Sequence, residues 1–208
     1  MSQGGTSSYR RSDWTSFPQR VRRAVERAER LHLELCVRPE IGRLLAVLAA
    51  GLPDDSVVGE TGTGTGAGLA WMVSAAKPKV RFVSYEIDPD RAEAARELFE
   101  DLGNVEVVCG DAAEIYGRGP FDLLVHDGGP GSGKSGDTPP IDPAAVLRPG
   151  GTMTVDDYTP TTTWPPMFGS TVDESRVHWL EHPILRSTEV RVAADLSVVL
   201  SRYLPNDS

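Results

Sequence analysis

The sequence is poor in three features that would point to other classes of protein. It has only two cysteines, Cys36 and Cys109, so a disulfide framework is excluded and we expect a reduced, cytoplasmic protein. No apolar run approaches the roughly 20 residues of a membrane-spanning helix, so no membrane partner is expected. Positive charge is scarce, with 21 lysine and arginine residues against 30 aspartate and glutamate residues. A nucleic-acid partner is therefore not expected, because such binding needs a basic face.

The length and composition are those of one globular domain. Of 208 residues, 39% are hydrophobic and 25% are charged, which is typical of a water-soluble chain. Residues 1–16 are rich in serine, glycine and arginine, and we expect a disordered tail there. Residues 17–208 are expected to form a single domain. It begins with helices within residues 19–51, the first of them expected over residues 19–35, where apolar residues recur at spacings of three and four.

From residue 56 onward, short apolar runs alternate with amphipathic helical patterns. The seven predicted strands cover residues 56–60, 80–86, 105–109, 121–126, 152–155, 189–193 and 197–203. The last two are separated only by a tight turn, which predicts an antiparallel hairpin. The pattern predicts an α/β fold, a doubly wound three-layer sandwich whose mostly parallel seven-stranded sheet ends in this hairpin. Right-handed crossovers would then place the ligand cleft at the carboxyl edge of the parallel strands.

The stretch from Val57 to Gly66 is the most informative part of the chain. Gly62, Gly64 and Ala67 satisfy the dinucleotide pattern G-x-G-x-x-A, and Glu86 lies where a ribose-binding acid belongs. Glu60, at the end of the preceding strand, argues against a pyrophosphate, because like charges about 4 Å apart near a protein surface cost a few kcal/mol. A ligand with a free ammonium group and no phosphate would instead be attracted. S-adenosylmethionine combines an ammonium, a sulfonium and a nucleoside.

Several motifs, in order, resemble those of the class I S-adenosylmethionine-dependent methyltransferases. The matching segments are residues 60–66, 85–89, 110–112, 121–127 and 147–151, and the terminal hairpin resembles the last two strands of that family. The resemblance covers residues 39–203. It implies a methyltransferase whose cofactor is S-adenosylmethionine.

The resemblance also implies roles for individual residues. The implied cofactor-binding set is Glu60, Thr61, Gly62, Gly64, Gly66, Glu86, Asp111, Ala112 and Asp127. In that family Glu60 would hold the methionine ammonium, Glu86 the ribose hydroxyls and Asp111 the adenine amino group. Two simpler interpretations remain open: Glu86 could be a solvated residue at a strand end, and Asp111 could only cap a helix.

Three carboxylates are predicted to meet at the edge of the sheet. Asp127 ends the fourth strand, and Asp156 and Asp157 end the fifth, which should be its neighbour. Three oxygen donors suit Mg²⁺ or Ca²⁺. The arrangement is similar to that of the catechol-type, metal-dependent O-methyltransferases, except that Asp157 stands where that group has asparagine. In the alternative, Asp156 and Asp157 only begin a turn, and Asp127 alone acts as the catalytic base or as a hydrogen-bond acceptor.

Three further motif matches are not expected to take part in catalysis. The catechol-type group has a catalytic lysine after its fourth-strand aspartate, but Lys134 follows Asp127 at a longer spacing, so we expect a mobile surface lysine. Residues 128–135 match the P-loop pattern, yet the glycine and prolines that follow exclude the helix that this motif requires. Residues 178–182 match the zinc-protease pattern H-x-x-E-H, but we expect a helix-to-strand connector, from which His178 could still face the acceptor site. Residues 161–170 are predicted to form a loop. Its segment 164–168, with two aromatic side chains, is predicted to form the acceptor wall, and a simple hydrophobic lid is the alternative.

The leading hypothesis is O-methylation of a small-molecule acceptor, with Mg²⁺ assistance left open. The alternatives are an NAD(P)-dependent oxidoreductase and a non-catalytic S-adenosylmethionine-binding module. The helices within residues 19–51 either cover the active site or pair with a second copy in a homodimer.

Overall fold

A computed structural model describes residues 5–134 and 138–205. Its centre is a seven-stranded sheet in the order β3-β2-β1-β4-β5-β9-β8. The first five strands are mutually parallel, and β9 lies antiparallel between β5 and β8. The strands are β1 (Val57–Thr61), β2 (Arg81–Glu86), β3 (Val105–Cys109), β4 (Phe121–His126), β5 (Leu147–Tyr158), β8 (Leu185–Arg191) and β9 (Ser197–Tyr203). The predicted α/β fold with a C-terminal antiparallel hairpin is confirmed.

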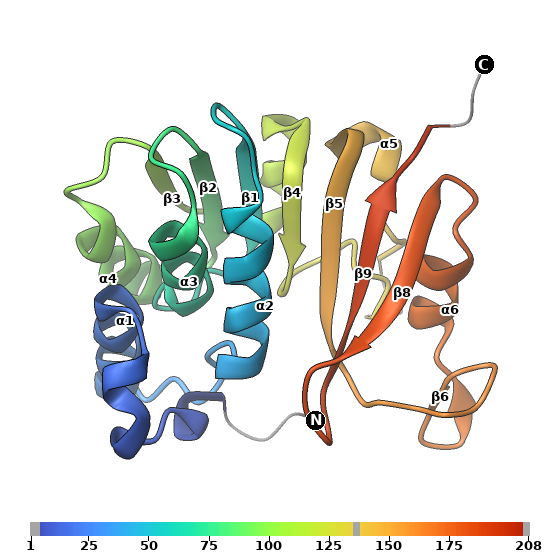
Figure 1. Cartoon of the computed structure of the whole chain (residues 1–208), viewed down its shortest axis with the longest axis horizontal. Coiled ribbons are helices and arrows are strands. Elements are labelled where there is room, and N and C mark those ends of the chain that lie inside the picture. Colours follow the sequence, from blue (N-terminus) through green and yellow to red (C-terminus); the bar gives the residue numbers. More distant parts are fainter. Residues whose placement is uncertain (1–4, 135–137, 206–208) are drawn as a thin grey trace.

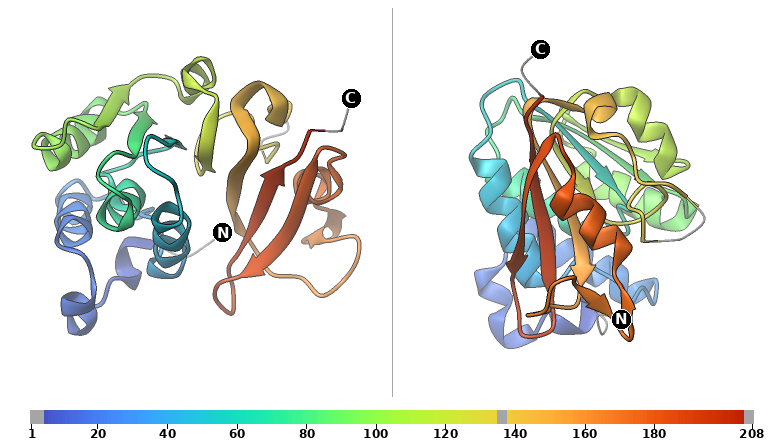
Figure 2. Two further views of the ribbon diagram at one scale, coloured as in Figure 1. Left: turned by 45° about the horizontal axis from the view of Figure 1, so that its top comes forward. Right: turned by 90° about the vertical axis from the view of Figure 1, so that its right-hand side faces the viewer.

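Helices cover both faces of the twisted sheet (Figures 1 and 2). One face carries α1 (Gln19–Arg30), α2 (Pro39–Ala50), α3 (Ala67–Ala75) and α4 (Pro89–Phe99). The other carries the 3-10 helix η3 (Ala112–Arg118), α5 (Pro143–Val146) and α6 (Glu174–Glu181). Each face buries its own apolar cluster, because successive side chains of a strand point to opposite faces. The parallel strands are therefore covered on both sides, as their apolar sequences predicted.

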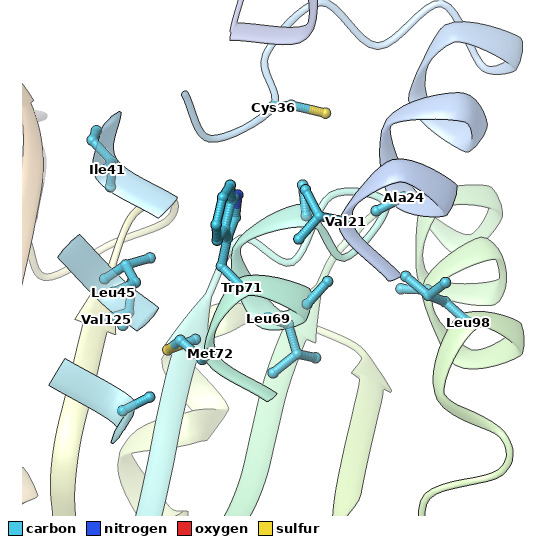
Figure 3. Packing of buried hydrophobic residues seen from close by; sticks show 14 of the residues in the cluster. Val21, Ala24, Cys36, Ile41, Leu45, Leu69, Trp71, Met72, Leu98 and Val125 are labelled. Atoms are coloured by element: carbon cyan, nitrogen blue, oxygen red, sulfur yellow. The ribbon is translucent and has the colours of Figure 1, made fainter. Parts of the chain in front are cut away.

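Trp71 of α3 is the centre of the first cluster. Figure 3 shows its ring between Ile41 and Leu45 of α2 on one side and Val21 of α1 on the other. A Cβ atom added to Gly42 would lie 2.2 Å from the indole nitrogen of Trp71, so α2 can approach α3 this closely only with glycine there. The N-terminal helices are thus part of the core that supports the glycine turn.

Two expectations about the N-terminal region are wrong. Residues 5–16, expected to be a disordered tail, form two 3-10 helices, η1 (Gly5–Ser8) and η2 (Arg11–Ser16). They are ordered because the aromatic rings of Tyr9 and Phe17 are buried against Trp71. The helix expected to continue to residue 35 ends at Arg30, and an extended linker follows. Residues 1–4 lie outside the described residues.

The segment after β5 is also more structured than expected. Within the predicted loop 161–170, β6 (Met167–Phe168) pairs with β7 (Thr171–Val172). The hairpin strand β8 begins at Leu185, earlier than expected, and pairs along its length with β9. The carboxyl ends of the parallel strands and the blue N-terminal segment lie at the same edge of the molecule (Figure 1). That edge holds the candidate site.

Candidate active site

A cavity of about 530 Å³ opens at the carboxyl edge of the sheet. This volume lies within the usual range of small-molecule sites. The predicted site residues that line it are Gly62, Gly64, Glu86, Asp111, Ala112, Asp127, Asp156 and Asp157. The opposite wall comes from the N-terminal region and includes Leu33, Leu35, Cys36 and Val37. The fold thus unites residues from five strand ends with a segment that motif reasoning did not assign.

The glycine turn approaches the cavity through its backbone. Gly62 and Gly64 have φ angles of +81° and +55°, in the region that favours glycine. A Cβ atom on Gly62 would lie 2.9 Å from the amide nitrogen of Gly128, so the two loops meet backbone to backbone. Gly66 also has a positive φ, but it does not line the cavity, and a Cβ there would meet the ring of Phe99 at 2.9 Å. Gly66 therefore serves the turn and its packing rather than ligand contact.

Glu86 and Asp111 lie at adjacent strand ends along the cavity. The Glu86 carboxylate accepts hydrogen bonds from the amides of Gly64 at 2.7 Å and Asp88 at 3.0 Å. These bonds hold it in place while leaving further lone pairs on its oxygens for ligand hydroxyl groups. Asp111 caps η3 by accepting from the Ala113 amide at 2.9 Å, and it also lines the cavity. Capping and ligand contact are thus compatible roles for Asp111.

Glu60 is buried in a narrow recess that it shares with Asp127 and Asp156. Ser84 donates a hydrogen bond to its carboxylate at 2.5 Å. A Cβ on Gly68 would lie 2.6 Å from the other oxygen, so the carboxylate lies against the first turn of α3. Burial, together with the charges of Asp156 and Glu86, raises the pKa of Glu60 to about 8. A cation beside this group would restore its ionised form.

Thr61, expected to line the cofactor, does not line the cavity. Because it follows Glu60 in the strand, its side chain points to the opposite face. There its hydroxyl lies 3.3 Å from Nδ1 of His126, which is fully buried. Burial and the charge of Lys134 lower the pKa of His126 to about 4, so the imidazole is neutral at pH 7. This pair braces β1 against β4 beneath the site.

The three carboxylates at the ends of β4 and β5 do converge. One oxygen each from Asp127, Asp156 and Asp157 can be chosen so that all lie within 4.8 Å of one another. Burial and mutual repulsion raise the pKa values of Asp127 and Asp156. Asp156 Oδ1 is buried without a hydrogen-bond partner. A buried, unpaired oxygen among like charges is an environment that a divalent cation would stabilise, so these residues fit a metal site.

Lys134, expected to be a mobile surface lysine, is exposed, but it lies against the acidic cluster. Its ammonium donates to the backbone oxygen of Asp156 and lies 4.0 Å from Asp156 Oδ1. It also lies 4.7 Å from the ring centre of Tyr158. The loop before it is anchored by Ser132, whose carbonyl accepts from Ser175 at 2.9 Å and from the Trp179 indole at 2.8 Å. The fold thus brings the Lys134 ammonium to the acidic cluster, a position that the sequence alone did not predict.

Other predicted contributors lie away from the cavity. Trp164 and Phe168 are 61% and 63% exposed, and neither lines it, so the expected acceptor wall is not formed by these rings. His178 contacts Trp179 and His182 within and after α6 and is not a cavity residue. Lys134 itself is not helical; Ser135, the last residue of the P-loop pattern, lies outside the described residues.

Sequence and structure comparisons agree with this geometry. Residues 60–158 match a family model described as a methyltransferase domain. A putative O-methyltransferase of Mycobacterium sp. (strain JLS) is 30% identical over 128 residues, which cover 57% of this chain and 56% of that protein. A probable O-methyltransferase of Mycobacterium tuberculosis (strain H37Rv) is 30% identical over 101 residues, 45% of each chain. The chain spans about half the length of these curated relatives.

Residues 60–158 thus match a methyltransferase domain, and solved O-methyltransferases have the same fold as this chain. The O-methyltransferase TomG from Streptomyces achromogenes, solved with S-adenosylmethionine, superposes with a TM-score of 0.70 at 22% identity and 91% coverage of both chains. The O-methyltransferase from Bacillus cereus, solved with S-adenosylhomocysteine, gives 0.68 at 17% identity, covering 95% of this chain and 99% of that one. The match over residues 60–158 favours the methyltransferase interpretation of the glycine turn over the oxidoreductase one.

The wall at residues 33–38 was the part of the candidate site that motif reasoning missed. Its signal was present in the alternation of apolar residues at Leu31, Leu33, Leu35 and Val37, which has the period of an extended segment rather than of a helix. The positive φ of His32, 53°, marks where the helix gives way to it.

Replacing Glu60 with glutamine is expected to separate ligand affinity from stability. The folded-state pKa of about 8 lies above the ordinary value of 4.5. The stability that Glu60 contributes is therefore fully present below about pH 4.5 and is lost as the pH rises through about 8. Glutamine cannot ionise, so at pH 9 Glu60→Gln should melt above the wild-type protein. It should also bind S-adenosylhomocysteine about tenfold to a hundredfold more weakly, since a hydrogen bond to a charged group is lost.

Calorimetric titration and thermal melts at pH 5 and pH 9 check both effects of Glu60→Gln. Glu100→Gln, an exposed change at the end of α4, is the matched control and should alter neither. Unchanged affinity together with a lower melting temperature at pH 9 would contradict the assignment.

Proposed function

We propose that this protein transfers a methyl group from S-adenosylmethionine to a hydroxyl group of a small molecule. The observation that supports it most is one cavity lined by Glu86, Asp111 and the Asp127–Asp156–Asp157 cluster, with Glu60 in the adjoining recess. The family match and the O-methyltransferase relatives support the same reaction. The donor supplies an electrophilic methyl group on a sulfonium and leaves as S-adenosylhomocysteine.

The donor half of the site would be held by groups of matching chemistry. We assign the methionine ammonium to Glu60, the ribose hydroxyls to Glu86 and the adenine amino group to Asp111. Gly62 and Gly64 offer backbone without side chains, so a ligand can approach closely. The buried carboxylates around this ligand explain why a cationic donor suits the cavity and a pyrophosphate does not.

The acceptor half would be the acidic edge beside it. The acceptor oxygen attacks the methyl carbon, the carbon–sulfur bond breaks, and its electron pair stays on sulfur. The acceptor proton must leave. Asp127 is our candidate to receive it, since burial and neighbouring carboxylates raise the pKa of Asp127 and so make its carboxylate a stronger base. Lys134 lies where it can balance negative charge at Asp156.

We further propose that Asp127, Asp156 and Asp157 bind Mg²⁺. A bound divalent ion would lower the pKa of an acceptor hydroxyl and fix its orientation. The expected result is that a chelator abolishes turnover and that added Mg²⁺ restores it, while calorimetry with Mg²⁺ gives saturable heat. Full turnover in chelator and no heat would leave Asp127 acting without a metal.

The test of the reaction is turnover by the full chain. The protein is incubated with S-adenosylmethionine and a panel of hydroxylated aromatic acceptors, and S-adenosylhomocysteine and methylated product are measured by mass spectrometry. Equal amounts of both are expected with at least one acceptor. Tight donor binding with no product from any acceptor would favour a non-catalytic binding module.

The setting of the reaction is a further proposal. Both cysteines are free in the structure, which supports a reducing, cytoplasmic compartment. Among the described residues, no helix has both the length and the apolar composition required to cross a membrane.

A further inference from the structure

The N-terminal segment contacts the cavity wall through its backbone. We call residues 5–17 the strap and residues 33–38 the wall. Gly5 of the strap and most of the wall line the cavity directly. A Cβ atom on Gly5 would lie only 1.6 Å from the carbonyl oxygen of Cys36, so at this point strap and wall touch backbone to backbone. Any side chain at residue 5 would force them apart.

Hydrogen bonds of Thr6 and Tyr9 also join the strap to the wall. The Thr6 amide donates to the Glu34 carbonyl at 3.0 Å, and the Thr6 hydroxyl donates to the Leu33 carbonyl at 2.6 Å. The Tyr9 hydroxyl donates to the Val37 carbonyl at 2.8 Å. These bonds hold the backbone of an extended segment that has no sheet partner among the described strands.

The strap is itself fixed to the core. Tyr9 is 4% exposed, and its hydroxyl accepts a hydrogen bond from the indole of Trp71 at 3.0 Å. Its ring packs edge-on against Phe17, which packs edge-on against Trp71. Trp71 belongs to α3, the helix that follows the glycine turn. One hydroxyl group therefore links the cavity wall to the element that carries the opposite side of the donor site.

We propose that Tyr9 and Gly5 are positioning residues for the methyl donor. They hold the wall at residues 33–38 against a ligand that lies on Gly62 and Gly64, although neither is assigned a ligand contact through its side chain. The inference rests on the proposed donor. It predicts that loosening the strap weakens donor binding and accelerates donor release, while the rate at saturating donor stays nearly unchanged.

The first test replaces the tyrosine hydroxyl alone. Tyr9→Phe keeps the buried ring and removes both hydrogen bonds, so the Kd for S-adenosylhomocysteine should rise about three- to tenfold. KM for the donor should rise by a similar factor, with kcat altered less than about twofold, because only binding of the donor is affected. Tyr203→Phe is the matched control, a buried tyrosine on β9 at the opposite edge of the sheet, and should leave Kd unchanged.

The second test uses glycine. Gly5→Ala should weaken binding at least as much as Tyr9→Phe, whereas Gly103→Ala should not, because a Cβ at Gly103 meets nothing within 4 Å. Titrations are run well below every melting temperature, and hydrogen exchange follows the amides of residues 33–38. Faster exchange there with weaker binding supports the proposal.

Two results would overturn it in different ways. If the wild-type protein binds the ligand and both variants bind it equally well, the strap has no positioning role, even if the variants melt earlier. If the wild-type protein fails to bind S-adenosylhomocysteine at all, the proposed donor is wrong, and this inference is wrong with it.

Discussion

Replacing Asp127 with asparagine is expected to reduce kcat/KM by about 10²–10⁴-fold, the usual contribution of a general base. Asp127 takes part in each role that we propose for the acidic edge of the site. It lines both the cavity and the recess of Glu60, and it lies with Asp156 and Asp157 in one cluster. Asparagine keeps the shape but can neither accept a proton nor carry charge.

The stability of the Asp127→Asn protein should move in the opposite direction. Burial and the charges of Asp156, Asp157 and Glu60 raise the pKa of Asp127, so its ionised form is disfavoured in the folded protein. Removing that charge relieves repulsion, and the melting temperature at pH 8 should stay the same or rise. A variant that is inactive yet at least as stable marks a functional residue rather than a structural one.

Steady-state rates and melts of Asp127→Asn are compared with those of Asp142→Asn. Asp142 caps α5 from an exposed position, and asparagine caps a helix equally well, so this control should be active and stable. Rates for Asp127→Asn within threefold of wild type would contradict the role of Asp127.

Replacing Arg176 with methionine is expected to have the largest effect on folding. The free energy of unfolding should fall by about 3–5 kcal/mol, as when one partner of a buried ion pair is removed. Arg176 is fully buried. It binds Asp173 through two nitrogens at 2.9 and 3.1 Å, Glu189 at 3.2 Å and the Thr159 carbonyl at 2.8 Å. Methionine would leave two carboxylates without their cation.

Arg176→Met should also disturb the packing beside the candidate active site. The guanidinium also lies 4.8 Å from the ring centre of Tyr158, beside which the Lys134 ammonium lies as well. Chemical denaturation measures the free energy of unfolding. The control is Arg81→Met, at an exposed position at the start of β2, whose free energy of unfolding should stay within about 0.5 kcal/mol of wild type. A loss below about 1 kcal/mol for Arg176→Met would show that this buried network contributes little.

The sheet could be predicted from the sequence because each of its signals is local. Apolar runs between capped helices predict parallel strands. Asp88 followed by Pro89 shows how local the helix signals are, since Asp88 accepts from two amides at the start of α4. The strap could not be predicted in this way. Its order depends on Tyr9 and Phe17 meeting Trp71, a contact between residues far apart in the chain that no periodicity encodes.

The residues of the candidate site likewise fall into those that local signals predict and those that depend on distant contacts. Glu86, Asp111 and the acidic cluster follow strand ends, so topology alone predicts their convergence. Thr61 was assigned to the cavity because it belongs to a motif, although strand alternation directs its side chain to the other face. Lys134 was set aside on spacing, yet the anchor at Ser132 brings it to Asp156. The motifs thus predicted which backbone segments surround the cavity, but they did not predict where every side chain points.

The central claim, that this cavity holds a methyl donor, is tested most directly by calorimetric titration of the wild-type chain with S-adenosylhomocysteine, with NADH as the competitor. We predict saturable binding of one molecule per chain that NADH does not displace. We also predict at least about tenfold weaker binding by Glu86→Gln, which loses the charge that we assign to the ribose hydroxyls. Binding of NADH with no heat from S-adenosylhomocysteine, or equal affinity for wild type and Glu86→Gln, would contradict it.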